Sequence, residues 1–266
     1  PTALSDKVPY TLRREQAQAV EQTLRYIQGN QTVDFAMPSS RAQYLWNAKP
    51  RFGKTLTTYD LIKRLGARNV LIVTNRPAIA DSWYGDYRRF VEGYYFISET
   101  GLIRDEAMTR AEYLEIMDQD KKQITFLSLQ DLKGARVFGG KYDKLEWIAD
   151  LGWDLLVIDE AHEGVDTRKT DKAFERIKRH FTLHLSGTPF KALADNKFAG
   201  DQIFNWSYLD EQKAKEAELA ADNEAGAHTD MPDLRLFNYK ISEATVDTIN
   251  EGVEINGKRV APASDL

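Results

Sequence analysis

The sequence contains no cysteine, so disulfide bonds and cysteine-based zinc sites are excluded. It also has no apolar run near the ~20 residues that a membrane-spanning helix needs, and no signal peptide opens it. We therefore expect a cytoplasmic protein with no membrane partner. The chain starts at Pro1 rather than at methionine, which is typical of a piece cut from a longer protein.

A strong positive charge, the usual signature of a nucleic-acid-binding protein, is also missing, because the net charge is −5. The charge is distributed unevenly. Residues 1–200 carry 30 Lys and Arg against 27 Asp and Glu, whereas residues 201–266 carry 6 against 14. The acidity belongs to the C-terminal part, and a nearly neutral body has room for a basic groove. Net charge alone therefore decides nothing about nucleic acid.

The hydrophobic pattern predicts alternating strands and helices after an opening helix over residues 12–28. Residues 70–73 and 155–158 are continuously apolar, which is typical of strands that are buried on both faces of a parallel sheet. We predict an α/β fold with a mostly parallel sheet, helices on both faces and ligands at the carboxyl ends of the strands. The predicted strands are 43–47, 69–74, 94–98, 124–129, 154–159 and 181–186, and the predicted helices are 55–65, 77–91, 108–117, 142–149 and 170–178.

The C-terminal part has a different pattern. Residues 210–221 predict a polar helix, residues 234–241 one more strand, and Asn256-Gly257 a hairpin turn. We predict a domain over residues 1–205 and an acidic appendage or linker over residues 206–266. Glu211-Gln212-Lys213 has a spacing that some nuclease sites share, but its highly charged surroundings favour a solvated helix face.

The first motif is a glycine and lysine pair where a strand passes into a helix. Gly53 lets the backbone approach a phosphate, Lys54 supplies a positive charge, and the hydroxyl of Thr55 is a possible Mg²⁺ ligand. The full phosphate-loop pattern has a further glycine where this chain has Ala48, and alanine does not easily adopt a positive φ. The Gly-Lys-Thr tripeptide by itself also occurs by chance.

The second motif follows the apolar strand that ends at residue 158. There Asp159 would hold Mg²⁺, and Glu160 would orient and deprotonate the attacking water, as phosphoryl transfer requires. A polar loop with a helix cap is the alternative. The third motif, Ser186-Gly187-Thr188-Pro189, is by itself a plain turn, and it gains weight from its place after the other two.

Together these residues resemble motifs I, II and III of superfamily 2 helicases and translocases. The chain is most similar to the DEAH-box branch typified by the motor subunits of type I and type III restriction enzymes, over about residues 10–200. The resemblance implies a RecA-like P-loop NTPase domain that uses ATP and Mg²⁺. It also implies that Gln16 recognises adenine, for which an amide is suited, and that His162, Ser186 and Thr188 couple hydrolysis to movement.

The same resemblance implies a nucleic-acid face. Residues 73–77, followed by Trp83, resemble motif Ia, and residues 126–130 resemble the segment that touches the tracked strand. The residues expected there are Thr74, Asn75, Arg76, Ser128 and Gln130. The tryptophans, among them Trp83, are expected to pack in the core rather than to stack on bases.

We therefore expect the ATP-binding half of an ATP-driven DNA translocase or helicase, with duplex DNA as its partner. Family members complete the site with a second RecA-like domain, and no second such unit fits in the 66 residues after residue 200. We expect nuclease or specificity modules as further partners, and slow ATP hydrolysis by this chain alone. An RNA helicase domain and a hydrolysis-deficient, nucleotide-gated binding module are the alternatives.

Overall fold

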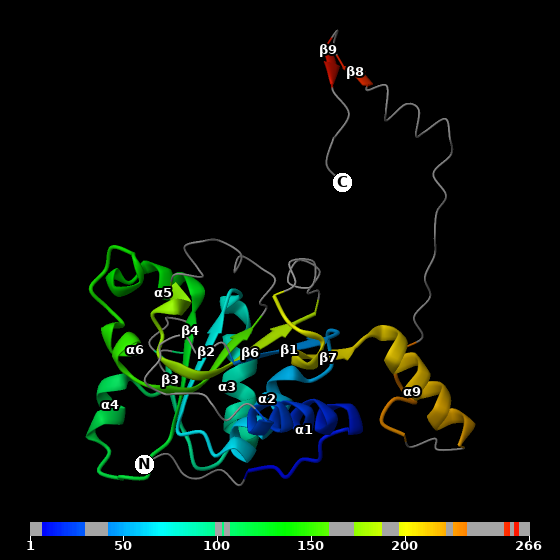
Figure 1. The fold of residues 1–266 in the computed structure, drawn as a ribbon, viewed down its shortest axis with the longest axis horizontal. Helices are drawn as coiled ribbons and strands as arrows, with labels where there is room; N and C mark the ends of the chain where they lie inside the picture. The colour runs from blue at the N-terminus through cyan, green and yellow to red at the C-terminus, as the bar shows by residue number, and fades with distance from the viewer. Residues whose placement is uncertain are drawn as a thin grey trace. The chain divides into compact units, whose positions relative to one another are not determined.

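The computed structural model describes residues 7–29, 42–98, 103, 107–159, 173–187, 197–221 and 226–232, together with the backbone of 253–255 and 258–260. The chain divides into two compact units, residues 1–229 and 230–266 (Figure 1). The first unit holds the large sheet. In the second, the described backbone forms an antiparallel hairpin of β8 (Val253–Ile255) and β9 (Lys258–Val260).

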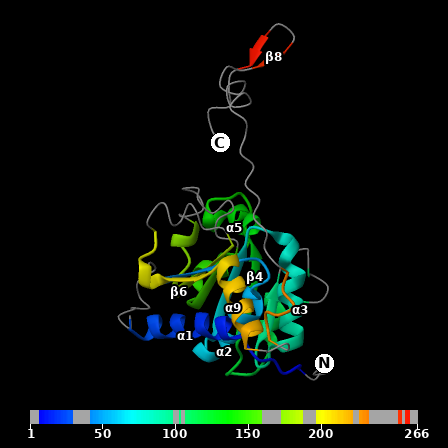
Figure 2. The same cartoon turned by 90° about the vertical axis from the view of Figure 1, so that its right-hand side faces the viewer.

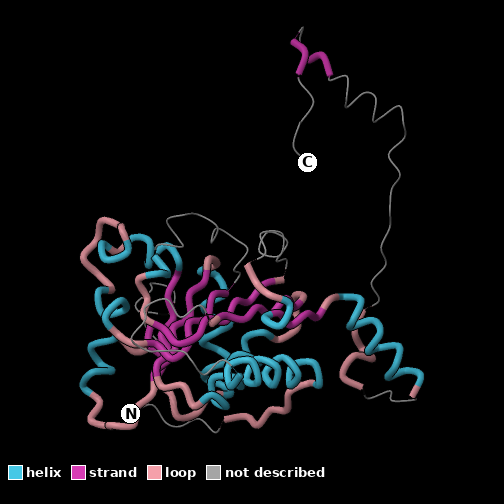
Figure 3. The backbone as a smooth tube through the Cα atoms, in the orientation of Figure 1, coloured by secondary structure: helices cyan, strands magenta, loops and turns pink. Residues whose placement is uncertain are grey.

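The first unit is built on a seven-stranded sheet in the order β3-β4-β2-β5-β6-β1-β7 (Figure 3). Every neighbouring pair in it is parallel, so each strand needs a crossover connection to the next. The strands are β1 (Gln43–Ala48), β2 (Asn69–Thr74), β3 (Tyr95–Ser98), β4 (Gln123–Ser128), β5 (Trp153–Asp159), β6 (Arg179–Ser186) and β7 (Ile203–Trp206).

The central strands are apolar on both faces because both faces of the sheet are covered. Successive side chains of β2 point to opposite sides, and Val70 and Ile72 join one hydrophobic cluster while Leu71 and Val73 join the other. In β5, Leu155 joins the first cluster, and the neighbouring residue joins the second. The prediction that these two strands are buried on both faces of the sheet is therefore confirmed.

Three helices cover the first face: α1 (Arg14–Gly29), α2 (Lys54–Leu65) and α3 (Ala80–Phe90). The second face is covered by α5 (Leu129–Gly134), α6 (Glu146–Asp150) and residues 173–177. Figure 2 shows α1 and α2 running beside each other. The polar helix α9 (Tyr208–Ala220) follows β7. Short elements complete the unit: α4 (Arg110–Glu115), η1 (Pro77–Ile79), η2 (Arg136–Phe138) and η3 (Gly200–Gln202). Among the described residues, no helix has the length and apolar character to cross a bilayer.

The predicted α/β fold with a parallel sheet is confirmed, and the six predicted strands form within one or two residues of their expected bounds. Four described elements were not predicted: β7, α5 and the short 3-10 helices η2 and η3. The expected helix over 142–149 is confined to α6, because Tyr142 forms a bridge with Ala135 instead. The expected strand over 234–241 lies outside the described residues. The predicted boundary between residues 205 and 206 stays a prediction.

Candidate nucleotide-binding site

The sequence motifs come together at the carboxyl edge of the sheet because their strands are neighbours with matching ends. In the register of the sheet, Thr74 stands between Ser128 and Asp159. On the other side of Asp159, β6 pairs through Leu185, and the next residue, Ser186, pairs with Asn47 of β1. The ends of five strands therefore form one row along this edge, the position where ligands bind in open α/β folds.

The phosphate loop, residues 48–54, leads from β1 into α2 through two residues with left-handed backbone. Gly53 has a φ of 87° and stands immediately before α2, and Arg51 has a φ of 67°. Ala48, where the sequence departs from the full pattern, is the last residue of β1 and does not have a positive φ. The lack of a glycine at this position therefore causes no backbone strain.

Lys54 lies over the loop that it closes. Its ammonium group donates to the carbonyl oxygens of Ala48 at 2.7 Å and Lys49 at 3.4 Å. The third motif is adjacent, since a methyl group built on Gly187 would lie 3.9 Å from Lys54 Nζ and 3.6 Å from Pro50 Cδ. Motifs I and III thus lie side by side, and Lys54 and Thr55 belong to the first turn of α2, where the helix dipole favours an anion.

Gln16 of α1 contacts the phosphate loop directly. Its Nε2 donates to the carbonyl oxygen of Phe52 at 2.8 Å, and its Oε1 accepts from the backbone N–H of Arg13 at 2.8 Å. Its side chain packs so closely that a Cβ at position 53 would lie 2.5 Å from Gln16 Nε2. Gly53 is thus required both by its backbone conformation and by this contact.

Asp159 ends β5 and is 6% exposed. Its Oδ2 accepts a hydrogen bond of 2.8 Å from the indole Nε1 of Trp83 on α3. The carbonyl of Trp83 in turn accepts from the hydroxyl of Tyr59 on α2 at 2.7 Å. Burial raises the pKa of Tyr59 well above its usual value, so Tyr59 stays a neutral donor. These two linked hydrogen bonds hold the carboxylate of Asp159 in one orientation. Trp83 is buried, as expected, but no sequence signal indicated its hydrogen bond to Asp159.

The residues expected to contact nucleic acid divide into two groups. Thr74 and Ser128 are buried and bond within their own turns. Thr74 Oγ1 accepts from the N–H of Arg76 at 3.0 Å, and Ser128 Oγ donates to Asp131 Oδ2 at 2.6 Å. Arg76 and Gln130 are exposed, and Asn75 is half-buried. The assignment of this face to nucleic acid stays a prediction.

Two histidines of β6, His180 and His184, are half-buried. Burial lowers the pKa of His180 to about 4 and that of His184 to about 3, and the latter pKa is lowered further by the charges of Arg179 and Lys197. Both rings are therefore neutral near pH 7. Among the residues that the structure describes, no group of three or more His, Asp or Glu is arranged to hold a metal ion.

Three predicted site residues, Glu160, His162 and Thr188, lie outside the described residues, and Ser186 is described and buried.

One expectation was wrong. Glu211 is not on a solvated face, since it is 4% exposed and its Oε1 lies 2.8 Å from the ammonium nitrogen of Lys49 in the phosphate loop. The charged neighbours of Glu211 in the sequence indicated an exposed helix face, because no local pattern reveals a partner in a loop that is distant in the sequence.

A parallel seven-stranded sheet, a phosphate loop between β1 and α2 and an aspartate at the end of β5 together define a RecA-like core of the helicase type. The solved ATPase core of a Sulfolobus solfataricus SWI2/SNF2 protein, in complex with dsDNA, has this fold. Its TM-score is 0.50 at 18% sequence identity, and the match covers 71% of this chain and 35% of that one. The UvsW helicase of bacteriophage T4 aligns with a TM-score of 0.47 at 15% identity, over 75% of this chain and 62% of that one.

Residues 9–191 match the family described as type III restriction enzyme, res subunit, and the chain belongs to this family. A relative is a putative type II restriction enzyme and methyltransferase, C-terminus, of Mycoplasma pneumoniae. It is 29% identical over 281 residues, which cover 90% of this chain and 37% of the relative. The chain thus spans little more than a third of that relative's length. The predicted resemblance to restriction-enzyme motors is confirmed.

Proposed function

We propose that this chain binds Mg²⁺-ATP at the carboxyl edge of its sheet and forms the ATP-binding half of a motor that moves along duplex DNA. The observation that supports the proposal best is the meeting of three motifs at one edge. The phosphate loop, the turn at Gly187 and the carboxylate of Asp159 come from β1, β6 and β5, which are neighbours in the sheet.

The chemistry of this edge suits a magnesium nucleotide. Lys54 and the first backbone amides of α2 supply positive charge for the phosphates, and Thr55 and Asp159 supply the oxygen ligands that Mg²⁺ prefers. When bound, Mg²⁺ would neutralise charge on the phosphates. We propose Glu160 as the base toward the attacking water, Gln16 as the residue that recognises adenine, and His162, Ser186 and Thr188 as coupling residues.

The DNA part of the proposal rests on the same edge. β2 and β4 end beside the nucleotide-binding strands. Asn75 and Arg76 follow β2, and Gln130 lies in the first turn of α5, which follows β4. We propose that these side chains contact the phosphate backbone, and that Thr74 and Ser128 shape the turns that carry them. Phosphate contacts position a protein on DNA without reading its sequence.

Isothermal titration with Mg²⁺-ATP and Mg²⁺-ADP tests the nucleotide site. We expect one site, with affinity lowered at least about tenfold in Lys54→Ala, because charge-assisted hydrogen bonds to phosphate are lost. Lys63→Ala is the matched control, since Lys63 is an exposed residue in the last turn of the same helix. Equal affinities of Lys54→Ala and Lys63→Ala would refute the phosphate-loop assignment.

Phosphate release, with and without duplex DNA or RNA, tests the motor. We expect Glu160→Gln to keep nucleotide binding and to lose turnover by about 10²-fold or more. We expect this chain alone to hydrolyse ATP slowly, because an arginine finger from a second domain contributes ~10³–10⁵ in rate in related reactions. Stimulation by RNA and not by DNA would favour an RNA helicase. Tight binding without turnover in the complete protein would favour a nucleotide-gated binding module.

A further inference from the structure

The polar helix α9 carries a carboxylate that is buried against the phosphate loop. Along α9, whose residues are all described, Glu211 is the single buried side chain. Its Oε1 lies 2.8 Å from Lys49 Nζ, and the two side chains are only 5% and 6% exposed. A buried carboxylate is costly unless it is paired. The one buried side chain of α9 is therefore a carboxylate, and it faces Lys49 of the phosphate loop.

Lys49 is held from several sides by the segment that contains β7 and α9. Its backbone N–H donates to the carbonyl of Trp206, the last residue of β7, at 3.0 Å. Its ammonium group also donates to the carbonyl of Pro50 at 3.2 Å and lies 4.8 Å from the ring centre of Tyr208. The first residue of the loop after β1 is thus tied by main chain and side chain to this later segment.

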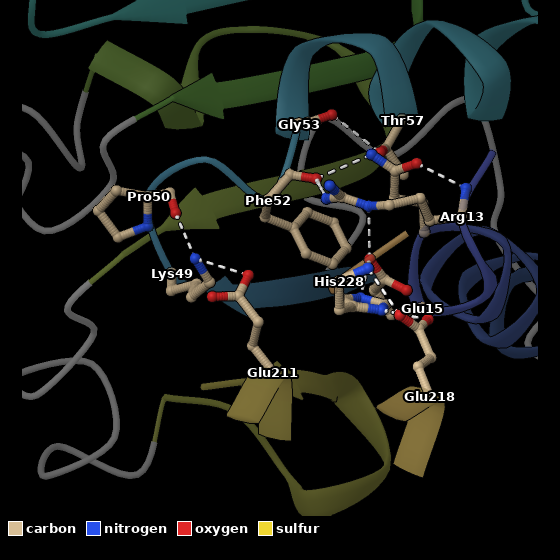
Figure 4. Close-up of polar contacts among 11 residues, drawn as sticks. Arg13, Glu15, Lys49, Pro50, Phe52, Gly53, Thr57, Glu211, Glu218 and His228 are labelled. Carbon is tan, nitrogen blue, oxygen red and sulfur yellow. Dashed lines mark hydrogen bonds and ion pairs between the residues drawn. The ribbon is translucent and has the colours of Figure 1, made fainter. Parts of the chain in front are cut away.

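The same segment reaches the other end of the loop through His228. The His228 ring, 4% exposed, lies between Glu218 of α9, at 2.8 Å from Nδ1, and Glu15 of α1, at 3.3 Å from Nε2. Glu15 Oε1 lies 2.6 Å from Arg13 Nε. Arg13 Nη2 donates at 2.6 Å to the carbonyl of Phe52, which also accepts from Gln16. Figure 4 shows both routes, from Glu211 to Lys49 and from Glu218 through His228 toward Phe52.

We infer that β7, α9 and residues 226–229 set the conformation of the phosphate loop from outside the sequence motifs, with Glu211 and His228 as positioning residues for nucleotide binding. Lys49 and Phe52 flank the part of the loop that must present its amides to phosphate, and this segment contacts one directly and the other through Glu15 and Arg13. The inference rests on the proposed nucleotide site. It adds two residues that lie outside the matched family region of residues 9–191.

Glu211→Gln in the full chain tests the inference, because it removes the charge and keeps the shape. We expect the dissociation constant for Mg²⁺-ADP to rise about tenfold, since the loop is no longer preorganised. The control is Glu216→Gln, an exposed position on the same helix, which should bind within twofold of wild type. His228→Gln leaves the pair of Lys49 and Glu211 in place and should also weaken binding, which provides a second variant if Glu211→Gln fails to fold.

Hydrogen exchange without nucleotide separates positioning from a general loss of stability. In Glu211→Gln we expect faster exchange of the amides of residues 49–57 and unchanged exchange in β2, whereas a merely structural role would raise both. If wild type binds Mg²⁺-ADP and Glu211→Gln binds it equally, with exchange of residues 49–57 unaltered, the inference is wrong although the proposed site stands. If wild type binds no nucleotide, the proposed function fails, and the exchange of residues 49–57 alone supports or overturns the inference.

Discussion

Trp83 is the residue whose role differs most from the one that its type indicates. It packs edge-on against Tyr59 with ring centres 5.4 Å apart, as a core aromatic does, and its Nε1 also donates to Asp159. An indole has one N–H and no acceptor, so Trp83 contacts the carboxylate only as a hydrogen-bond donor. Trp83 therefore orients Asp159, the proposed Mg²⁺ ligand, through one donated hydrogen bond.

We expect Trp83→Phe to lower the affinity of the proposed nucleotide site for Mg²⁺. Outer-shell partners of metal ligands typically contribute about 10–100-fold in metal affinity, and the Mg²⁺ concentration at half-maximal ADP binding should rise accordingly. The free energy of unfolding should fall by about 1.5–3 kcal/mol, because one hydrogen bond to a charged group is lost. Titration of Mg²⁺ at fixed ADP and urea unfolding measure the two effects.

Trp153→Phe is the control for that prediction. Trp153 is also fully buried, and its Nε1 donates to the carbonyl of Ile148 at 2.9 Å, away from the motifs. This variant should lose comparable stability and keep the Mg²⁺ dependence of wild type. If both tryptophan variants change Mg²⁺ dependence equally, the bond to Asp159 has no specific role.

At the scale of elements, the motif residues also build the ends of helices. Ser128 ends β4 and caps α5, because its Oγ accepts from the N–H of Asp131 at 3.0 Å. Asp131 is held in addition by Lys144 at 2.9 Å. A serine at this position was expected to touch nucleic acid, and the structure shows that its hydroxyl already has a local structural task.

We expect Ser128→Ala to cost about 1 kcal/mol of stability, the usual contribution of a serine N-cap, measured by urea unfolding. Its effect on affinity for duplex DNA should be smaller than that of Gln130→Ala, because Gln130 is exposed in the same helix and Ser128 is buried. Fluorescence anisotropy at two salt concentrations provides the comparison. A larger loss of DNA affinity in Ser128→Ala than in Gln130→Ala would show that the hydroxyl contacts DNA after all.

At the scale of the whole molecule, the division of the chain decides which contacts a fragment keeps. The first compact unit ends at residue 229, whereas the acidic composition predicted a boundary after residue 205. Between these two positions lie Glu211 and His228, the partners of Lys49 and Glu15. A fragment that ends before α9 would leave Lys49 without its carboxylate partner.

Two truncations test the boundary. Residues 1–229 should unfold in urea with a free energy close to that of the same unit in the full chain. Residues 1–206 should lose roughly 3–5 kcal/mol, the usual effect of removing one partner from a buried ion pair. The added variant Lys49→Met should recover part of that loss in the shorter fragment, because it removes the unpaired charge. Equal stability of the two fragments would instead support the boundary at residue 205.

The sequence by itself determined six of the seven strands of the sheet, most of the longer helices and the residue types of the phosphate loop. These features are local: hydrophobic periodicity is set by neighbours a few residues apart, and a phosphate loop needs its glycine, lysine and hydroxyl in one short run. For the same reason Gly53, Lys54 and Asp159 were recognisable, and their meeting at one edge follows from parallel strands that end together.

Only the tertiary structure decided the order of the strands in the sheet and the pairing of polar side chains that are distant in the sequence. Lys49 meets Glu211, Trp83 meets Asp159, and His228 meets Glu15, although no local pattern links the members of any pair. A glutamate on a charged helix is indistinguishable in sequence from a solvated one, because its burial depends on the segment against which the helix packs. The burial of Glu211 depends on the whole fold, because the pairing of β7 with β1 places Glu211 of α9 beside Lys49 of the phosphate loop.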